Sequence, residues 1–286
     1  MTPRITAVIA VVGALAVGAV GYLAGTGQNR PAPSLVDEAL AAEATPTSGA
    51  AGAQSAEFSD DQRKELEGII RNYLIANPEV IADAINELQR RRDDAAQAAQ
   101  TKTIADAADQ IFASQYQVVL GNPDGRVTLV EFFDYNCTYC RRAEADMKKL
   151  IAGDPKLRVV LKQFPVLGPG SVEAAKVAVA LHMSAPEKYA EFHDALLEEP
   201  GQVDGERALA VAASLGVDEA TVKAKLDSEE VRRTIAEAYD LAGKLNLTGT
   251  PSYVTRKEVI VGAVGYDALK TKIDTLASAC TTAKDC

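Results

Sequence analysis

Residues 127–140 read VTLVEFFDYNCTYC, and the fold prediction starts from this stretch. Residues 127–133 form a mostly apolar run of the kind that makes a buried strand. Cys137 and Cys140 follow, and residues 141–151 then have the spacing of a helix. Two thiols three positions apart can close a small ring only where the backbone turns, as it does at a helix N-terminus. A CxxC between a strand and a helix is more typical of a redox site than of a metal site.

The composition narrows the range of functions. The chain has 286 residues, enough for one full domain plus a smaller element. Its net charge of −10 argues against nucleic-acid binding, which needs clustered Lys and Arg. Histidine occurs only at His182 and His193, which weakens any hypothesis of imidazole metal ligands or of a catalytic triad.

The N-terminus predicts export. Residues 5–27 are uncharged and mostly apolar, Arg4 precedes them, and acidic residues follow at Asp37 and Glu38. The stretch fits a signal peptide with a long apolar region, and it is also long enough to span a bilayer. No sharp A-x-A cleavage site lies near Ala24, which favours an uncleaved anchor over a cleaved signal peptide. A buried core helix is disfavoured because the segment is terminal and a linker follows it. The positive-inside rule then exports the rest, so we expect a periplasmic protein, tethered to the inner membrane by residues 5–27 if they are not cleaved. The cysteines would lie in an oxidising compartment.

A linker and a helical segment come next. Residues 28–57 are rich in Ala, Pro, Ser, Thr and Gly and are predicted to be a flexible linker. In residues 58–114, Ser59 and Gln62 have the spacing of a capping box. Asn77-Pro78 is expected to end one helix and cap the next, with Pro at the first helical position. Apolar residues recur at helical spacing in two stripes: Leu66, Ile69, Ile70, Tyr73 and Leu74, then Val80, Ile81, Ala84, Ile85 and Leu88.

This helical segment is too thin to bury its own apolar stripes. It either packs back on the main domain or pairs with copies of itself. The stripes lie early in residues 58–114 and the later part is polar, so we favour pairing and predict an oligomerisation segment.

Residues 115–280 are predicted to form one α/β domain. Strands are expected at 116–120, 127–133, 157–164, 252–254 and 259–261, a closing helix at 266–279, and helices at about 171–246 with breaks near Pro186, Pro200 and Leu215. This order is that of a thioredoxin fold with an inserted helical subdomain after its third strand. Residues 281–286 are the C-terminal tail.

Cys137 is predicted to be the attacking thiolate. A free thiol has a pKa of about 8.5, and the helix N-terminus in a CxxC motif lowers it. Cys140, one turn into the helix, would resolve the mixed disulfide. The alternatives are a plain disulfide, half of a zinc site, or a Cu(I) site formed by the two thiolates. Because the dithiol is itself the redox centre, we expect no cofactor and no metal.

Thr250-Pro251 is the second candidate element. A Pro at the start of a strand can follow a cis peptide bond. The backbone N–H and C=O of Thr250 would then pair with an extended substrate segment by strand addition. An ordinary loop proline is the alternative, and the CxxC in this fold order favours the substrate-binding role.

Together these segments resemble the DsbA-like thiol:disulfide oxidoreductases of the thioredoxin superfamily. The resemblance covers about residues 116–279 and rests on EFFDYNCTYCRRAE, KQFPVLGPGSVEAA and TGTPSYV. It implies exchange of disulfides with unfolded or misoxidised cysteine-containing proteins. It also implies a membrane partner that resets the dithiol, either a quinone-linked oxidase or a transmembrane reductant. By the same resemblance Glu131, six positions before Cys137, is a buried acid that moves protons to or from Cys140; the alternative is a partly exposed strand carboxylate.

Residues 60–94 resemble the N-terminal domain of the ScsC branch, the suppressor-of-copper-sensitivity proteins. That branch uses this segment to oligomerise, and some of its members are disulfide isomerases. The resemblance therefore implies a homo-oligomer, as a trimer.

Two departures from the best-known oxidase bear on the activity. The residues between the cysteines are Thr138-Tyr139 instead of Pro-His, whose His helps to stabilise the thiolate. Thr250 precedes the proline, as in the isomerase branch. Both departures favour an isomerase or a mild oxidase. The remaining cysteines, Cys280 and Cys286, are expected to form a structural disulfide, with a mobile second redox pair as the alternative.

Overall fold

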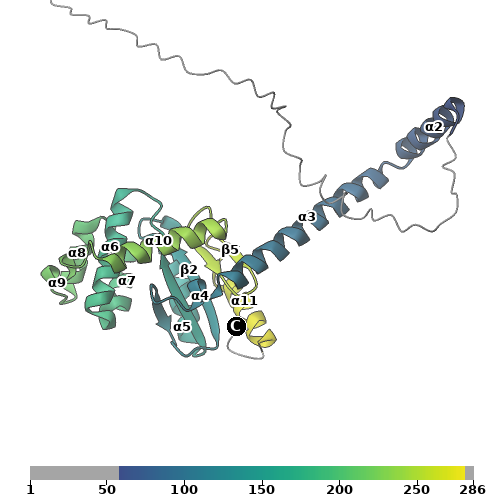
Figure 1. Cartoon of the computed structure of the whole chain (residues 1–286). Coiled ribbons are helices and arrows are strands. Elements are labelled where there is room, and N and C mark those ends of the chain that lie inside the picture. Colours follow the sequence, from purple (N-terminus) through teal and green to yellow (C-terminus); the bar gives the residue numbers. More distant parts are fainter. Residues whose placement is uncertain (1–57, 281–286) are drawn as a thin grey trace, which may run out of the picture. The chain divides into compact units, whose positions relative to one another are not determined.

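The computed structural model describes residues 58–280 (Figure 1). Among them, the residues up to Ile69 and those from Ile70 onward belong to two separate units. The expected leader at 5–27, linker at 28–57 and tail at 281–286 lie outside the described residues. Within residues 58–280, no helix combines the length and apolar character that crossing a membrane would require.

The order of elements confirms the predicted fold class. The helices are α2 (Asp60–Ala76), α3 (Glu79–Asp106), α4 (Ala108–Phe112), α5 (Thr138–Gly153), α6 (Pro169–Ser184), α7 (Tyr189–Glu198), α8 (Gly205–Ser214), α9 (Glu219–Lys223), α10 (Glu229–Lys244) and α11 (Tyr266–Ala279), with a 3-10 turn at Pro186–Lys188. The strands are β1 (Val118–Gly121), β2 (Val127–Phe133), β3 (Leu157–Gln163), β4 (Ser252–Val254) and β5 (Val259–Val261). Figure 1 shows α6 to α9 gathered beside the sheet as the inserted subdomain.

The five strands form one sheet in the order β1-β3-β2-β4-β5. β2 is central: it pairs in parallel with β3 and antiparallel with β4. All seven residues of β2 are buried, which explains why its sequence is a mostly apolar run with no clean alternation. The carboxyl end of this strand leads directly to the two cysteines.

Side chains of β2 alternate between two apolar clusters. Leu129 and Phe133 belong to the larger cluster, which also contains buried residues of α5, α7 and α11. Val130 and Phe132 belong to the second cluster, with residues of α4 and α10. Because successive strand residues point to opposite faces, Glu131 lies on the same face as Leu129 and Phe133. The acid is therefore on the side of the sheet that α5 covers.

The start of the helical segment agrees with its sequence pattern. Ser59 and Gln62 form the predicted capping box, in which each backbone N–H bonds the other side chain. Asn77 ends α2 by donating from its side chain to the Tyr73 carbonyl at 2.9 Å. Pro78 is the residue that precedes α3 and not its first helical residue, which corrects the predicted position by one.

The end of the helical segment is part of the α/β core. Ile104 of α3 and Ile111 and Phe112 of α4 are buried in the second apolar cluster. Buried Lys162 of β3 donates to the Gln110 carbonyl at 2.8 Å and pairs with Glu237 of α10 at 2.8 Å. Packing thus extends the core of the α/β domain upstream of residue 115, to about Ile104.

Candidate active site

Cys137 and Cys140 begin helix α5, as predicted. Cys137 is the N-cap residue with extended backbone angles (φ −78°, ψ 114°), and its sulfur accepts the backbone N–H of Cys140 at 3.4 Å. Both cysteines are reduced and buried. A sulfur at the N-cap receives a hydrogen bond that a serine or aspartate oxygen usually receives, so the helix end stabilises a negative charge there.

The surroundings of Cys137 favour its thiolate. A hydrogen bond from Cys140 lowers the pKa of Cys137 to about 5; burial opposes this, and Thr250 and the backbone N–H groups of Cys140 and Tyr139 lower it further. Cys137 is therefore ionised at neutral pH. A thiolate with a low pKa is also a good leaving group, so a disulfide that contains it is readily transferred.

Titration of the reduced protein is expected to show one thiolate with a midpoint pH of about 5. The folded pKa lies below the ordinary value of 9.0, so the Cys137 thiolate stabilises the reduced protein fully above pH 9. That contribution is lost as the pH falls through 5. Ultraviolet thiolate absorbance and thermal unfolding measure the two effects, with Cys137→Ser as the control. A midpoint at the ordinary value would contradict the helix-cap geometry.

Thr250 and Pro251 lie against the reactive sulfur. The Cys137 sulfur lies 3.1 Å from the Thr250 carbonyl oxygen, which accepts its hydrogen when the thiol is protonated, although the two residues are 113 positions apart. The Thr250–Pro251 peptide bond is cis, as expected. The Pro251 carbonyl accepts the backbone N–H of Gly262 at 2.9 Å, which connects this loop to the end of β5. The carbonyl before the proline thus lies beside the sulfur.

Cys140 and Glu131 are both buried, and the charge of Glu131 acts on the Cys140 thiol. Burial is the main cause that raises the pKa of the Cys140 thiol, with further contributions from Cys137 and from the charge of Glu131. Glu131 is 4% exposed, so it is not a partly exposed strand carboxylate. Burial, followed by the charges of Glu144 and Cys137, raises its pKa to about 8. The Cys137 thiol is therefore much more acidic than the Cys140 thiol. Glu131 can hold a proton near neutral pH.

Two polar residues that the sequence analysis did not single out hold the loop before Cys137. Buried Asp134 accepts the backbone N–H groups of Asn136 at 2.8 Å and Leu167 at 2.9 Å. Asn136 bonds both backbone groups of Val203, its amide nitrogen donating at 2.8 Å and its oxygen accepting at 2.7 Å. The sequence signal was present, since an Asp-x-Asn before a CxxC is typical of a turn with side-chain to backbone hydrogen bonds.

Glu144 of α5 was also missed. It is buried, and its Oε2 lies 3.6 Å from Nε2 of His193 on α7. Its position in a helix with a polar outer face gave no indication of burial. Cys280 is disulfide-bonded; Cys286, its expected partner, is not among the described residues.

The comparisons with known proteins agree with this geometry. Residues 128–274 match the DSBA-like thioredoxin domain, and residues 62–95 match the N-terminal domain of copper resistance protein ScsC. Disulfide bond formation protein D of Bacillus subtilis is 31% identical over 172 residues, which cover 55% of this chain and 76% of that protein.

Solved structures give the same result. A thioredoxin-like oxidoreductase from Silicibacter pomeroyi is 39% identical, with a TM-score of 0.58 over 60% of this chain and 98% of that one. A linker-deletion mutant of Proteus mirabilis ScsC is 26% identical, with a TM-score of 0.60 over 79% of this chain and 100% of that one. The chain therefore belongs to the DsbA-like thioredoxin domain family and is a thiol:disulfide oxidoreductase.

Proposed function

We propose that Cys137 is the nucleophile and Cys140 the resolving thiol of disulfide exchange with protein substrates. The observation that carries this assignment is the different acidity of two thiols one helical turn apart. Cys137 has a pKa of about 5 and caps the helix, whereas burial keeps Cys140 protonated. Only Cys137 is therefore a thiolate, ready to attack, at neutral pH.

With these roles, the dithiol can either reduce a substrate disulfide or oxidise two substrate thiols. In reduction, the Cys137 thiolate attacks a substrate disulfide and releases one substrate thiolate. Cys140 loses its proton and attacks Cys137, which forms the internal disulfide and releases the second substrate thiolate. In oxidation, a substrate thiolate attacks Cys137, and Cys140 leaves and takes up a proton. A second substrate thiolate then attacks the substrate sulfur of the mixed disulfide, which forms the substrate disulfide and releases Cys137 as a thiolate. No cofactor is required, because the two electrons are held by the dithiol.

Unfolded or misoxidised cysteine-containing proteins are the substrates that we propose. Exposed apolar side chains lie on three segments that flank Cys137: Tyr139, then Val166 and Leu167, then Val261 and Val264. Hydrogen bonds connect the second and third segments to Asp134 and Pro251. An apolar rim around the sulfur suits chain segments whose own apolar residues are exposed. Thr250 would pair with the backbone of such a segment, which requires no particular sequence.

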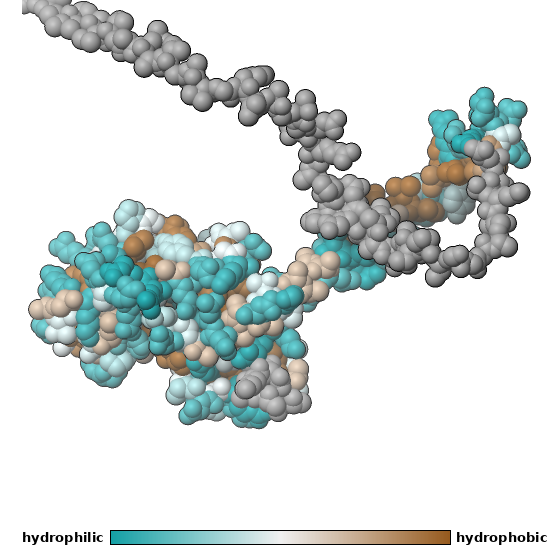
Figure 2. All heavy atoms as spheres, in the orientation of Figure 1, coloured by the Kyte–Doolittle hydropathy of each residue, from teal (hydrophilic) through white to brown (hydrophobic). Residues whose placement is uncertain are grey.

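The helical segment is proposed to assemble copies of the chain into a homo-oligomer, as a trimer. α2 has no buried residue, and Ile104 is the only buried residue of α3. Ile70, Tyr73, Ile81 and Ile85 are exposed apolar residues of these helices. Figure 2 shows apolar surface along them. These side chains are exposed in the single chain, which supports their burial by identical helices. Several active sites in one particle would favour isomerisation, in which one disulfide is opened and another is formed.

Export to the periplasm completes the proposal. It rests on the apolar sequence at residues 5–27 and on the oxidising compartment that thiol–disulfide chemistry needs. A membrane partner would reset the dithiol, either a quinone-linked oxidase or a transmembrane reductant. Tethering by residues 5–27 would keep the protein close to such a partner.

One experiment tests the proposed function and distinguishes isomerase activity from oxidase activity. The protein is supplied with a scrambled multi-disulfide substrate and, separately, with the same substrate fully reduced. An isomerase recovers native activity from the scrambled form, whereas an oxidase acts on the reduced form. Because Cys137 is a thiolate at neutral pH while Cys140 stays protonated, we expect reshuffling well above the rate with glutathione alone. Failure in both assays would show that the assignment of the dithiol is wrong.

Copper handling through the two thiolates receives no specific support. The segment that matches the copper resistance protein's N-terminal domain, residues 62–95, contains no Cys, His or Met. Burial also raises the pKa of Cys140, which disfavours the second thiolate that a Cu(I) site would need.

A further inference from the structure

The side chain of Asn136 bonds the inserted helical subdomain to the loop that precedes Cys137. Its oxygen accepts the backbone N–H of Val203 at 2.7 Å, and its nitrogen donates to the Val203 carbonyl at 2.8 Å and to the Ser171 hydroxyl at 2.9 Å. Ser171 lies in the first turn of α6, and Val203 lies between α7 and α8. Both are buried, so removing the amide leaves buried polar groups without this partner unless the subdomain shifts.

Side chains on both sides of the CxxC make further bonds to the inserted part of the chain. Asp134 accepts the backbone N–H of Leu167, just before α6, at 2.9 Å. Arg141 donates to the carbonyl of Glu199, at the end of α7, at 2.6 Å. The residues around the two cysteines therefore hold the inserted part ahead of α6, at the end of α7 and, through Asn136, ahead of α8.

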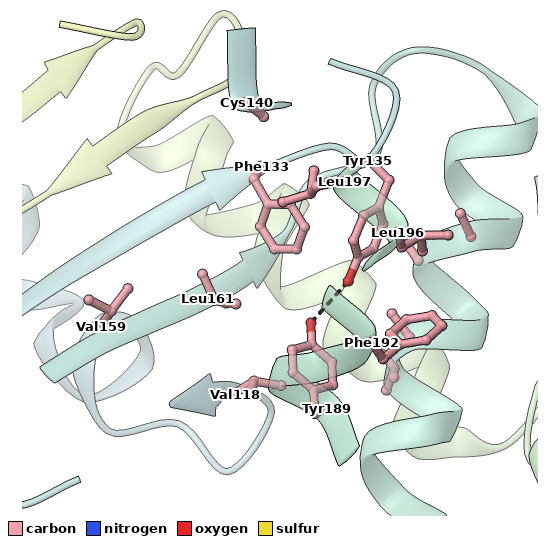
Figure 3. Packing of buried hydrophobic residues seen from close by; sticks show 14 of the residues in the cluster. Val118, Phe133, Tyr135, Cys140, Val159, Leu161, Tyr189, Phe192, Leu196 and Leu197 are labelled. Atoms are coloured by element: carbon pink, nitrogen blue, oxygen red, sulfur yellow. Dashed lines mark hydrogen bonds between the residues drawn. The ribbon is translucent and has the colours of Figure 1, made fainter. Parts of the chain in front are cut away.

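Tyr135 anchors the same loop in the apolar core of the subdomain. Its side chain is 1% exposed, and its ring meets that of Phe192 edge to face with 6.3 Å between the ring centroids. Figure 3 shows Tyr135 among buried residues of α7, with its hydroxyl facing that of Tyr189 at 3.3 Å. This packing does not involve Asn136. A variant that lacks the Asn136 amide should therefore fold with the subdomain docked, but held less firmly.

The segment between β3 and α6 has a fixed backbone but exposed apolar side chains. Val166 and Leu167, here called the apolar ridge, are 41% and 49% exposed. The backbone is held on both sides, because Tyr239 donates to the Pro165 carbonyl and Asp134 accepts from Leu167. Apolar side chains on a fixed backbone lose little conformational freedom when they bind. The apolar ridge is therefore prearranged for contact with another apolar chain segment.

The contacts of the reactive sulfur come from other elements. Cys137 Sγ accepts the Cys140 N–H at 3.4 Å and lies 3.1 Å from the Thr250 carbonyl oxygen. Asp134 closes the turn before it, since its carbonyl accepts the Cys137 N–H at 3.0 Å and its side chain accepts the Asn136 N–H at 2.8 Å. Truncating the Asn136 side chain removes none of these bonds. The thiolate and its attack on a small disulfide should therefore be unaffected.

We propose that Asn136 is a positioning residue for protein substrates. Through Ser171 and Val203 it holds the start of α6, and with it the apolar ridge, at a fixed place near Cys137. The ridge then contacts apolar residues beside the cysteine of an extended, unfolded substrate segment. The proposal rests on the proposed function in taking Cys137 as the thiolate that exchanges with the substrate. It adds that affinity for a protein substrate depends on a side chain that acts through the subdomain.

The test compares a protein substrate with a small one, using the full-length protein. Reduction of a disulfide in an unfolded protein and reduction of glutathione disulfide are measured for the wild type and for Asn136→Ala. With the protein substrate, KM should rise about tenfold at nearly unchanged kcat, because binding contacts are lost and the chemistry is intact. With glutathione disulfide, the rate should stay within about twofold of the wild type. The midpoint of the Cys137 titration should remain at about 5.

Asn122→Ala is the matched control. Asn122 also donates from its side chain to a backbone carbonyl, that of Pro155 at 2.7 Å, but it lies between β1 and β2, at the end of β2 away from Cys137. It should leave KM and kcat for both substrates unchanged. An equal rise of KM in Asn122→Ala would show a general loss of stability and would count against the proposal.

A double-mutant cycle shows whether Asn136 acts through the apolar ridge. Replacing Val166 and Leu167 together by Ser removes the ridge and should by itself raise KM for the protein substrate. Adding Asn136→Ala to that variant should raise KM by less than about twofold more, because no ridge remains for Asn136 to position.

The outcomes separate this inference from the proposed function. If Asn136→Ala does not fold, as judged by circular dichroism, Ser171→Ala decides the question, since it removes one of the three bonds and should raise KM by a smaller factor. An unchanged KM for the protein substrate in the folded variant, an equal fall in rate with glutathione disulfide, or additive effects in the cycle would overturn the proposal. A wild type that reduces neither substrate would instead refute the proposed role of the dithiol.

Discussion

Cys137→Ser is expected to abolish thiol–disulfide exchange, whereas Cys140→Ser should stop the reaction one step later. Cys137 has a low pKa because the N-terminus of α5 and the Cys140 thiol stabilise its charge. A serine hydroxyl at this site remains protonated at neutral pH and does not attack sulfur. The rate should therefore fall to that of the uncatalysed exchange, measured by reduction of a protein disulfide or by refolding of a scrambled substrate.

Cys140→Ser provides the matched control. Cys137 keeps its position at the helix end, so the variant should still attack a substrate disulfide. Without the second thiol the mixed disulfide persists, and a covalent protein–substrate complex should be visible on non-reducing gels. Its absence in Cys137→Ser would confirm the order of the two thiols. Accumulation of the complex in Cys137→Ser instead would reverse their roles.

Ile81→Lys is expected to dissociate the oligomer into monomers. Ile81 is 47% exposed in the single chain and lies in the apolar stripe of α3. If identical helices bury that stripe, each copy of the variant would place an ammonium group in an apolar interface, at a cost of several kcal/mol for each copy. Light scattering on protein that begins near Phe58 should give a trimer mass for the wild type and a monomer mass for the variant.

Asp83→Lys is the control for this substitution. It adds the same lysine to the same exposed helix two positions away, where the side chain points to a different face. Asp83→Lys should remain oligomeric. Ile81→Lys should also lose reshuffling of scrambled disulfides while it keeps, or gains, oxidation of reduced substrate, because each dithiol is intact. A wild type that is already a monomer would contradict the proposed assembly.

Local sequence patterns were sufficient to predict the strands that lead to the thiols and follow the proline. The strands at residues 127–133, 252–254 and 259–261 and the helix at 266–279 have the predicted bounds. Each is a short apolar run or a periodic segment between strong turn residues, so neighbouring residues alone determine its type. The first strand begins at Val118 instead of Tyr116, because pairing with β3 determines where it starts.

The inserted helices show where local patterns fall short. The breaks near Pro186, Pro200 and Leu215 are present, but a further break at residues 224–228 was not predicted. That segment contains no proline or glycine, and Ser228 begins α10 by accepting the backbone N–H of Val231. A serine inside a polar helical run is a weak signal, since it becomes a cap only where packing ends one helix and starts another.

The sequence by itself determined the identity of the chemistry. Cys137, Cys140 and Thr250-Pro251 are recognisable because the roles that we propose for them depend on residue type and on a local turn. Both are properties of a few adjacent residues. Glu131 could be added only by resemblance, since a single acid in an apolar strand has no local pattern of its own. Its burial and its raised pKa became visible only when β2 was placed in the centre of the sheet.

The tertiary structure alone decided which distant groups act on those residues. It brings the Thr250 carbonyl to 3.1 Å from Cys137 and places His193 of α7 3.6 Å from Glu144 of α5. These pairs lie on separate segments, so no spacing in the sequence predicts them. In the sequence the two histidines indicate neither a metal site nor a triad, yet His193 is buried beside a carboxylate. In the proposed function the CxxC defines the reaction. The protonation of its surroundings depends on charges and dipoles that only folding brings together, because electrostatic effects follow distance in space and not along the chain.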